Sequence, residues 1–294
     1  MTARAWAELL RISALFTVPG DALAGAAAAG LRPNRSTALA VGASLCLYEA
    51  GMALNDWADR DEDAVDRPHR PIPSGRISPR AALTAAGALT GAGLALAARA
   101  GRPALTVATG LAATVWAYDL RLKHTPAGPA AMAAARGLDL LLGATATGAA
   151  PSPRAARAAL PAAALLSTHT YAVTTVSRHE TQGGSTSAPL AALAAVAGIG
   201  GAVVQERQVP RNAPARLLLT ALTGAYLRTA ARPLVHAALN PSPPLTQRAV
   251  GSGIRAMIPL QAALAARAGS AGSALAVMGL VPLARALSRK VSPT

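Results

Sequence analysis

Long apolar stretches follow one another along the chain, and short polar breaks separate them. A helix needs roughly 20 mostly apolar residues to cross a bilayer, and each stretch comes close to that length. They cover residues 11–31, 36–54, 80–99, 103–120, 128–150, 157–176, 187–205, 215–238, 248–267 and 270–287. The pattern predicts an all-α fold, a polytopic membrane helical bundle of about nine transmembrane helices, in a single domain over residues 1–294.

Two of these stretches are weaker because charged residues interrupt them. Residues 215–238 contain Arg228 and Arg232, and residues 248–267 contain three arginines. Charged side chains in the middle of a bilayer are costly. Nine and ten spans therefore both fit, and one of the two stretches is a candidate for a surface helix.

The composition agrees with a lipid environment. Hydrophobic residues make up 52% of the chain and charged residues 14%, with a mean hydropathy of +0.34. A soluble domain carries roughly 25% charged residues. An alanine-rich soluble helical array would show a repeat with charged outer faces, and the sequence contains no such repeat.

The net charge of +15 is spread over the polar breaks. No basic stripe with interleaved aromatic residues is present, which argues against nucleic acid and for membrane lipids as partners. With a cytoplasmic N-terminus, the polar segments 55–79, 120–127 and 177–186 are also cytoplasmic. Together with the N-terminal tail they hold ten Arg and Lys, against six in the first three opposite breaks. We expect a multi-pass protein of the cell membrane with cytoplasmic active-site loops. The Ala- and Arg-rich composition suggests a bacterial inner membrane.

Acidic residues are concentrated in one short segment. The chain has 13 Asp and Glu, and seven of them lie within residues 49–66. Asn55, Asp56, Asp59 and Asp63 would share one face of a helix. A solvated loop is the simpler interpretation, but it does not explain the shared face. Because carboxylate and amide oxygens suit Mg²⁺, we interpret the four residues as candidate metal ligands.

A proline-rich basic stretch follows directly. Residues 67–78 read RPHRPIPSGRIS, in which Arg67, Arg70 and Arg76 offer forked donors to phosphate oxygens. Carboxylates for a metal followed by arginines for an anion predict a site that binds metal and phosphate together.

The contiguous string NDWADRDEDAVDRPHRPIPSGRIS resembles the first aspartate-rich signature of the UbiA prenyltransferase family. The resemblance implies a bundle around a central cavity, an isoprenyl diphosphate donor held through Mg²⁺, and an aromatic or hydroxyl-bearing, lipid-like acceptor. It implies catalytic roles for Asp56, Asp59 and Asp63, and substrate binding by Asn55 and the signature arginines, Arg67 and Arg70.

The segment from Tyr118 to Lys123 is similar to the family's Tyr…Lys segment, whose lysine contacts diphosphate. Lys123 is therefore a candidate catalytic residue and Tyr118 a candidate substrate-binding residue. A membrane anchor that follows the positive-inside rule is an equally simple interpretation of Lys123.

Most family members carry a second aspartate-rich motif, which this chain lacks. After Asp139 the only acidic residues are Glu180 and Glu206. In the corresponding segment, Glu180 is a candidate second metal ligand, and Arg178 and His179 are candidate diphosphate ligands. A plain cytoplasmic turn is the alternative. The departure resembles a divergent bacterial branch of the family and leaves one or two Mg²⁺ open.

Four ionisable residues fall inside predicted spans, where they are usually functional or paired. Arg136 and Asp139 are three residues apart and are expected to pair with each other. Asp21 and Glu49 are candidates for the acceptor end of the cavity. Glu49 lies two helical turns before Asp56 on the same face, which makes it a candidate substrate-binding residue.

The predicted reaction is electrophilic alkylation by a prenyltransferase. Positive side chains would neutralise the departing diphosphate while apolar walls shield the allylic cation. Two alternatives remain: a non-catalytic prenyl-lipid binding or export component, and a terpene cyclase on the same fold. A cyclase would be expected to hold more aromatic residues than one Phe, three Trp and four Tyr.

Overall fold

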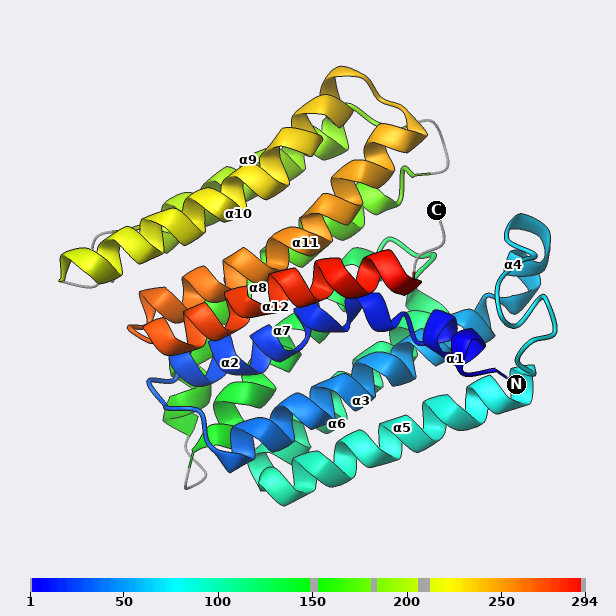
Figure 1. The fold of residues 1–294 in the computed structure, drawn as a ribbon, viewed down its shortest axis with the longest axis horizontal. Coiled ribbons are helices and arrows are strands. Elements are labelled where there is room, and N and C mark those ends of the chain that lie inside the picture. The colour runs from blue at the N-terminus through cyan, green and yellow to red at the C-terminus, as the bar shows by residue number, and fades with distance from the viewer. Residues whose placement is uncertain (1, 149–152, 181–183, 206–211, 292–294) are drawn as a thin grey trace.

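A computed structural model describes residues 2–148, 153–180, 184–205 and 212–291. This part of the chain contains helices and no strand (Figure 1), so the expected all-α fold is confirmed. Its elements in order are α1 (Ala3–Leu9), η1 (Ile12–Thr17), α2 (Pro19–Ala28), α3 (Arg35–Ala58), α4 (Arg60–Asp66), α5 (Pro79–Ala100), α6 (Arg102–Ala117), η2 (Tyr118–Leu122), α7 (Gly128–Thr147), α8 (Pro153–Ser177), α9 (Ser187–Val203), α10 (Ala213–Leu239), α11 (Pro243–Arg267) and α12 (Ala271–Val291).

Each apolar stretch identified in the sequence coincides with a helix. Two of them are divided: the first, because η1 ends at Thr17 and Pro19 begins α2, and 103–120, because η2 follows α6 at Tyr118. Proline is well placed at the start of α2, since the first turn of a helix has no partner for its N–H. Several other helices, among them α5, α6 and α7, also have proline in their first turn.

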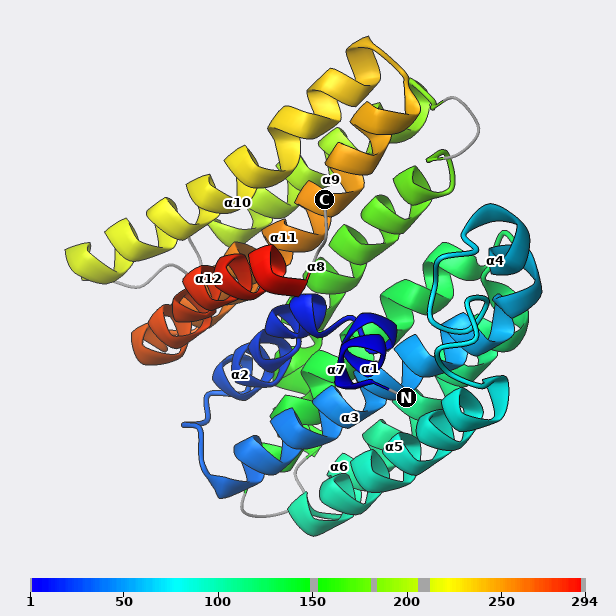
Figure 2. The ribbon, with the colours of Figure 1, turned by 45° about the vertical axis from the view of Figure 1, so that its right-hand side comes forward.

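The helices lie in two groups (Figures 1 and 2). Helices α3, α5 and α6 lie together on one side, and α9, α10 and α11 on the other. Helices α2, α7 and α8 join the groups, with α7 packed on both α6 and α8. Among the described residues, two apolar cores lie on either side of α2 and α7, and a third, smaller one lies between α1, α3 and α5.

Close packing of α2 on α7 depends on two glycines. A Cβ atom on Gly25 would lie 1.9 Å from the carbonyl oxygen of Leu140, and one on Gly143 would lie 2.3 Å from that of Ala22. Small residues allow such close contact between helices in lipid, where packing replaces the hydrophobic effect as the source of association.

Helices α3, α5 and α11 are each long and apolar enough to cross a membrane on length and composition alone. Helix α11 contains one of the weak stretches, 248–267. It packs against α2, α8, α10 and α12, and 78% of its most apolar window is buried inside the bundle. Of the two weak stretches, 248–267 is therefore not a surface helix.

The predicted polar segment 55–79 is not a simple loop. Helix α3 continues to Ala58, and α4 follows after a break at Asp59. At the end of α3, α4 extends beyond the other helices (Figure 1). The candidate aspartates are therefore fixed by helical backbone.

Candidate active site

Of the four motif residues, Asn55 and Asp56 lie on the last turn of α3, Asp59 at the break and Asp63 on α4. Helical hydrogen bonds continue across the break, from the Asp59 N–H to the Asn55 carbonyl at 2.9 Å and from the Asp63 N–H to the Asp59 carbonyl at 2.8 Å. Asp56 and Asp63 are buried, with 4% and 1% of their surface exposed. Buried carboxylates need cationic partners, and the chain supplies them.

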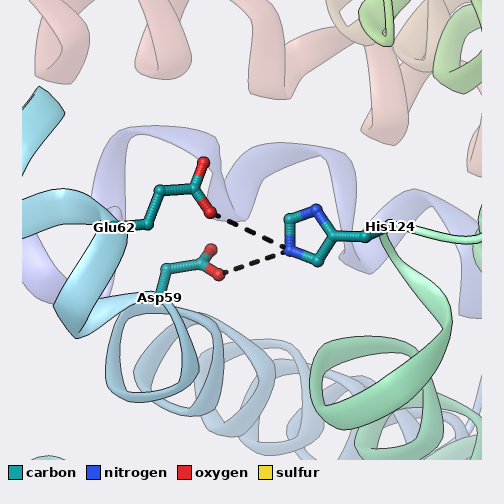
Figure 3. Close-up of side chains that lie close together, drawn as sticks. All are labelled: Asp59, Glu62 and His124. Atoms are coloured by element: carbon teal, nitrogen blue, oxygen red, sulfur yellow. Dashed lines mark ion pairs between the residues drawn. The ribbon is translucent and has the colours of Figure 1, made fainter.

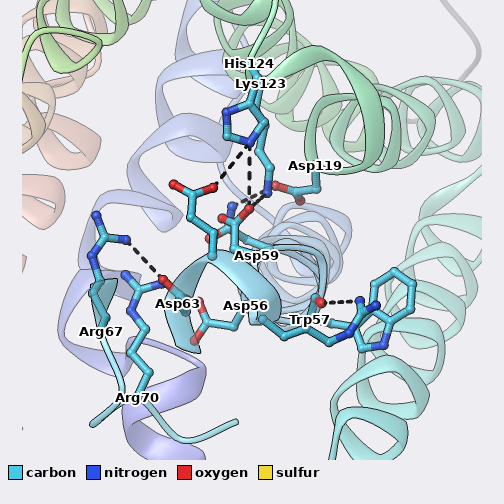
Figure 4. Close-up of polar contacts among 12 residues, drawn as sticks. Asp56, Trp57, Asp59, Asp63, Arg67, Arg70, Asp119, Lys123 and His124 are labelled. Atoms are coloured by element: carbon cyan, nitrogen blue, oxygen red, sulfur yellow. Dashed lines mark hydrogen bonds and ion pairs between the residues drawn. The ribbon is translucent and has the colours of Figure 1, made fainter. Parts of the chain in front are cut away.

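Arg70 joins the two buried aspartates. Its guanidinium donates to Asp63 at 2.6 Å and to Asp56 at 3.4 Å, and Arg67 adds a longer contact to Asp63 at 3.4 Å (Figure 4). The predicted proximity of these two arginines to the acidic motif is therefore present.

Arg11 is a further partner, from the other end of the sequence. Its guanidinium donates to Asp56 at 3.0 Å and to Asn55 at 3.4 Å. Arg11 has φ 48° and ψ 48°, a left-handed conformation that costs a non-glycine residue about 1–2 kcal/mol. Strain of this kind is often found where the surrounding structure holds a functional side chain in place.

The segment after α6 meets the motif from the opposite side. The η2 segment is a π-helical turn, closed by a hydrogen bond of 2.9 Å from the Lys123 N–H to the Tyr118 carbonyl. Such turns are frequent at functional sites. Lys123 donates to Asp59, and Asn55 donates to Asp119 at 3.2 Å (Figure 4). Lys123 therefore makes a specific contact with the motif.

The four predicted metal ligands do not converge on one ion here. Asp56 and Asp63 are bound to Arg70, whereas Asp59 is bound to Lys123 and Asn55 to Asp119. Among the described residues, one cluster has ligand atoms that all lie within 4.8 Å of one another: Asp59, Glu62 and His124 (Figure 3). It borders a cavity of about 390 Å³ that Asp119 and Lys123 also line.

The loop from Arg67 to Ser78 is held by its own side chains. Ser74 donates to the Arg70 carbonyl at 2.6 Å, and Arg76 donates to the His69 carbonyl at 2.7 Å and to Glu8 of α1 at 2.5 Å. Arg76 thus fastens the loop to α1 instead of facing the acidic motif. Arg70 is held in place by this loop.

We call the acidic motif and its charged and polar partners, with Arg11, Asn55 and Asp119 among them, the diphosphate cluster. A cavity of about 220 Å³ begins at this cluster and extends into the bundle. Arg11, Asn55, Tyr118 and Asp119 line one part of it, so Tyr118 lies where it was predicted. Its walls are mostly apolar side chains of α3, α6 and α7. This cavity matches the expected central cavity.

Three further predicted site residues have other surroundings. Glu49 is not among the residues lining the cavity, whereas Tyr48 and Met52 are. Substrate binding by Glu49 stays a prediction. The guanidinium of Arg178 donates to the Thr125 carbonyl at 2.5 Å. His179 is half-buried, in a turn after α8. Residues 181–183 of the same predicted segment lie outside the described residues.

Glu180 is half-buried at the edge of the cluster. Burial raises its pKa above the usual value of 4.5, and the positive charge of Arg67 partly opposes that shift. Arg67 is therefore near both Asp63 and Glu180. Metal binding by Glu180 stays a prediction.

Two residues of the cluster were not predicted as site residues. Asp119 stands next to Tyr118 in the segment already singled out, so the local pattern contained a signal for it. Arg11 belongs to a tail whose arginines look like ordinary membrane anchors, and no sequence pattern links it to Asp56. Its role depends on the path of η1 and α2 past the end of α3.

With this geometry in view, the family of the chain is clear. Residues 13–239 match the model of the UbiA prenyltransferase family. The chain belongs to the UbiA prenyltransferase family, and it is an integral membrane protein.

Curated relatives are similar over part of their length. A digeranylgeranylglyceryl phosphate synthase of Methanopyrus kandleri is 38% identical over 128 residues, which cover 42% of this chain and 45% of that protein. The synthase of the same name from Methanothrix thermoacetophila is 37% identical over 164 residues, covering 55% and 60%. The chain spans about half the length of these relatives.

Solved structures show the same fold over nearly their whole length. A UbiA homolog from Aeropyrum pernix K1 has a TM-score of 0.71 at 19% identity, covering 85% of this chain and 96% of that one. A UbiA homolog from Archaeoglobus fulgidus bound to GPP and Mg²⁺ has a TM-score of 0.64 at 21% identity, covering 88% and 99%. At these identities the likeness concerns the fold.

Proposed function

We propose that this chain transfers a prenyl group from an isoprenyl diphosphate to an aromatic or hydroxyl-bearing, lipid-like acceptor within the membrane, in a reaction that requires Mg²⁺. One observation carries the proposal: an apolar cavity has Arg11, Asn55 and Asp119 at one end, beside the buried aspartates. A charged head and an apolar tail match these two environments. The Archaeoglobus homolog bound to GPP and Mg²⁺ supports the same assignment.

The chemistry of the donor set fits Mg²⁺. Asn55, Asp56, Asp59 and Asp63 offer only oxygen ligands on their carbonyl and carboxylate groups, which Mg²⁺ prefers together with substrate phosphates. Bound Mg²⁺ would hold the diphosphate and reduce the charge that builds on it. Glu180 is the candidate for a second ion, half-buried beside Arg67.

The chain's own cations act on the leaving group. Arg11, Arg70 and Lys123 are bound to carboxylates in this structure and can donate to phosphate oxygens when a diphosphate enters. Donors placed where charge develops are a major source of catalysis. As the allylic C–O bond breaks, these groups stabilise the diphosphate that leaves.

The cavity walls act on the prenyl group. Leu47, Met52, Leu111, Val115 and Met132 line the cavity and keep water from the allylic cation. The acceptor then forms the new C–C or C–O bond and loses a proton. The chain supplies no nucleophile in this reaction.

The proposed location is the inner membrane of a bacterium, with the α4 end of the bundle in the cytoplasm. The excess of Arg and Lys in the segments at that end supports this orientation. Alkaline phosphatase fused after Ser177 would be inactive if the orientation is right. An active fusion would mean that the orientation is the opposite one.

Turnover tests the proposal. The protein in nanodiscs is incubated with geranyl, farnesyl and geranylgeranyl diphosphates, Mg²⁺, and phenolic, quinone-precursor and glyceryl phosphate acceptors. Diphosphate release and prenylated products are measured for the wild type, Asp59→Ala and Asp61→Ala. Asp61 is the matched control, because it lies on the same segment with its side chain 88% exposed.

We expect Mg²⁺-dependent transfer by the wild type and the Asp61 variant, and none by the Asp59 variant. Mg²⁺-dependent donor binding without release, across the whole panel, would favour a carrier. Release with a cyclised donor and no acceptor adduct would favour a cyclase. No binding of any donor would refute the proposal.

A further inference from the structure

The cavity contains a second group of polar residues, away from the diphosphate cluster. Ser44, Tyr48, Arg136 and Asp139 line it there, and we call these four residues the cavity floor. Apolar side chains of α3, α6 and α7 line the space between floor and cluster. An isoprenyl tail that follows the cavity therefore meets hydrogen-bonding and charged groups at its end.

The floor is tied to helices on both sides of the bundle. Arg136 donates to Asp21 at 2.5 Å, and Gln261 of α11 donates to the other oxygen of Asp21 at 2.7 Å. Asp139 accepts a hydrogen bond from Ser44. The predicted pairing of Arg136 with Asp139 is thus replaced by pairing with Asp21. Helix α2 brings Asp21 close to α7 because Gly25 and Gly143 allow close approach.

The depth of the cavity follows from α3. Ser44, Tyr48 and Asn55 all line it, and each lies within one stripe of this helix. Asn55 lies eleven positions after Ser44, which corresponds to a rise of about 16 Å at 1.5 Å per residue. The cavity therefore offers a tail roughly this length between the diphosphate end and the floor.

Donor tails compare with this depth as follows. With C–C bonds of about 1.5 Å, each advancing the chain by about 1.3 Å, extended geranyl, farnesyl and geranylgeranyl main chains are roughly 9, 14 and 20 Å long. Geranyl ends above the floor, farnesyl reaches it, and geranylgeranyl exceeds the depth. A longer tail must displace charged groups from their partners or leave them unsolvated, and both are unfavourable.

We propose that the cavity floor limits the donor to tails no longer than farnesyl. This inference rests on the proposed function and specifies its substrate class. It sets the chain apart from the archaeal relatives, whose names specify a digeranylgeranyl product.

The test removes two of the four residues of the cavity floor and keeps the ion pair between Arg136 and Asp21. The double variant Ser44→Ala/Asp139→Ala removes the two groups that bond to each other, while Asp21 and Arg136 remain together. We expect the ratio of kcat/KM for geranylgeranyl over geranyl diphosphate to rise roughly tenfold or more, since one added methylene in a pocket changes specificity by about 10- to 200-fold. Ser252→Ala is the matched control: Ser252 is a buried serine outside the cavity, bonded to the Thr229 carbonyl.

Equilibrium binding of the three donors with Mg²⁺ is measured beside turnover, and thermal melting checks that each variant is folded. A wild type that prefers geranyl or farnesyl, with the preference shifted in the double variant alone, supports the inference. Equal use or binding of geranylgeranyl diphosphate by the wild type, with no shift in the double variant, overturns it while the proposed function stands. Absence of binding for all three donors overturns both. If the double variant is unfolded, two measurements decide. Asp139→Asn keeps the shape and polarity of the floor, so it should keep the donor preference of the wild type. A wild type without preference still overturns the inference.

Discussion

Replacing Arg11 separates its role in the site from its effect on the backbone. Arg11 donates to Asp56 at 3.0 Å and to Asn55 at 3.4 Å from a left-handed backbone conformation. A hydrogen bond to a charged group contributes about 1.5–3 kcal/mol. If Arg11 transfers that interaction to the departing diphosphate, Arg11→Ala should lower kcat/KM by about 10- to 150-fold, at 1.4 kcal/mol for each factor of ten.

Arg11→Gly is the matched variant. It removes the same guanidinium but accepts φ 48° without strain. We expect both variants to lose the same activity, and the glycine variant to be more stable than the alanine variant by about 1 kcal/mol. Diphosphate release and detergent-solubilised thermal melting give the two measurements. An alanine variant with wild-type kcat/KM would refute the assignment of Arg11 to the site, and equal stability of the two variants would refute the strain.

Other changes test the remaining features of the structure. Asp56→Ala should abolish Mg²⁺-dependent diphosphate release, and chelation of Mg²⁺ should do the same reversibly; residual release above one per cent of wild type would count against the metal site. Gly143→Ala should lower the melting temperature through its clash with Ala22, whereas Gly91→Ala, with nothing within 4 Å, should raise it because alanine favours a helix by about 1 kcal/mol. The opposite order would contradict the close packing of α2 on α7. The pKa of Glu180 is raised by burial, so the folded state binds the extra proton and the wild type should lose stability relative to Glu180→Gln as the pH rises above 4.5 through that pKa. A difference that does not change with pH would contradict burial of this carboxyl.

Hydrophobic patterning predicts most of this fold. Each helix forms its backbone hydrogen bonds within itself, so a long apolar stretch is enough to identify it. Every predicted stretch is helical, including 215–238 and 248–267, which look weak because of their arginines. Burial could not be predicted for the second of these: three arginines suggest a surface position, yet α11 packs against α2, α8, α10 and α12.

The site was predictable where its residues are close in sequence. Asp56, Asp63, Arg67 and Arg70 lie within one signature, and the structure brings them into contact. Contacts between distant segments were not predictable. Asn55 meets Asp119 across 64 residues of sequence, and Arg136 pairs with Asp21 across 115. Sequence spacing favoured Asp139 as the partner of Arg136, because spacing within one helix carries no information on the position of α2, which supplies Asp21.

The central claim is that the acidic and basic cluster above the cavity supports Mg²⁺-dependent prenyl transfer. The most direct measurement is the mass of the product formed from an isoprenyl diphosphate and the acceptor panel, in nanodiscs, with Mg²⁺ varied from chelated to millimolar. The account predicts an acceptor that gains one prenyl group, together with one diphosphate released per product, only when Mg²⁺ is present and Asp59 is intact. Product formation that is equal with and without Mg²⁺, or unchanged in Asp59→Ala, would contradict it.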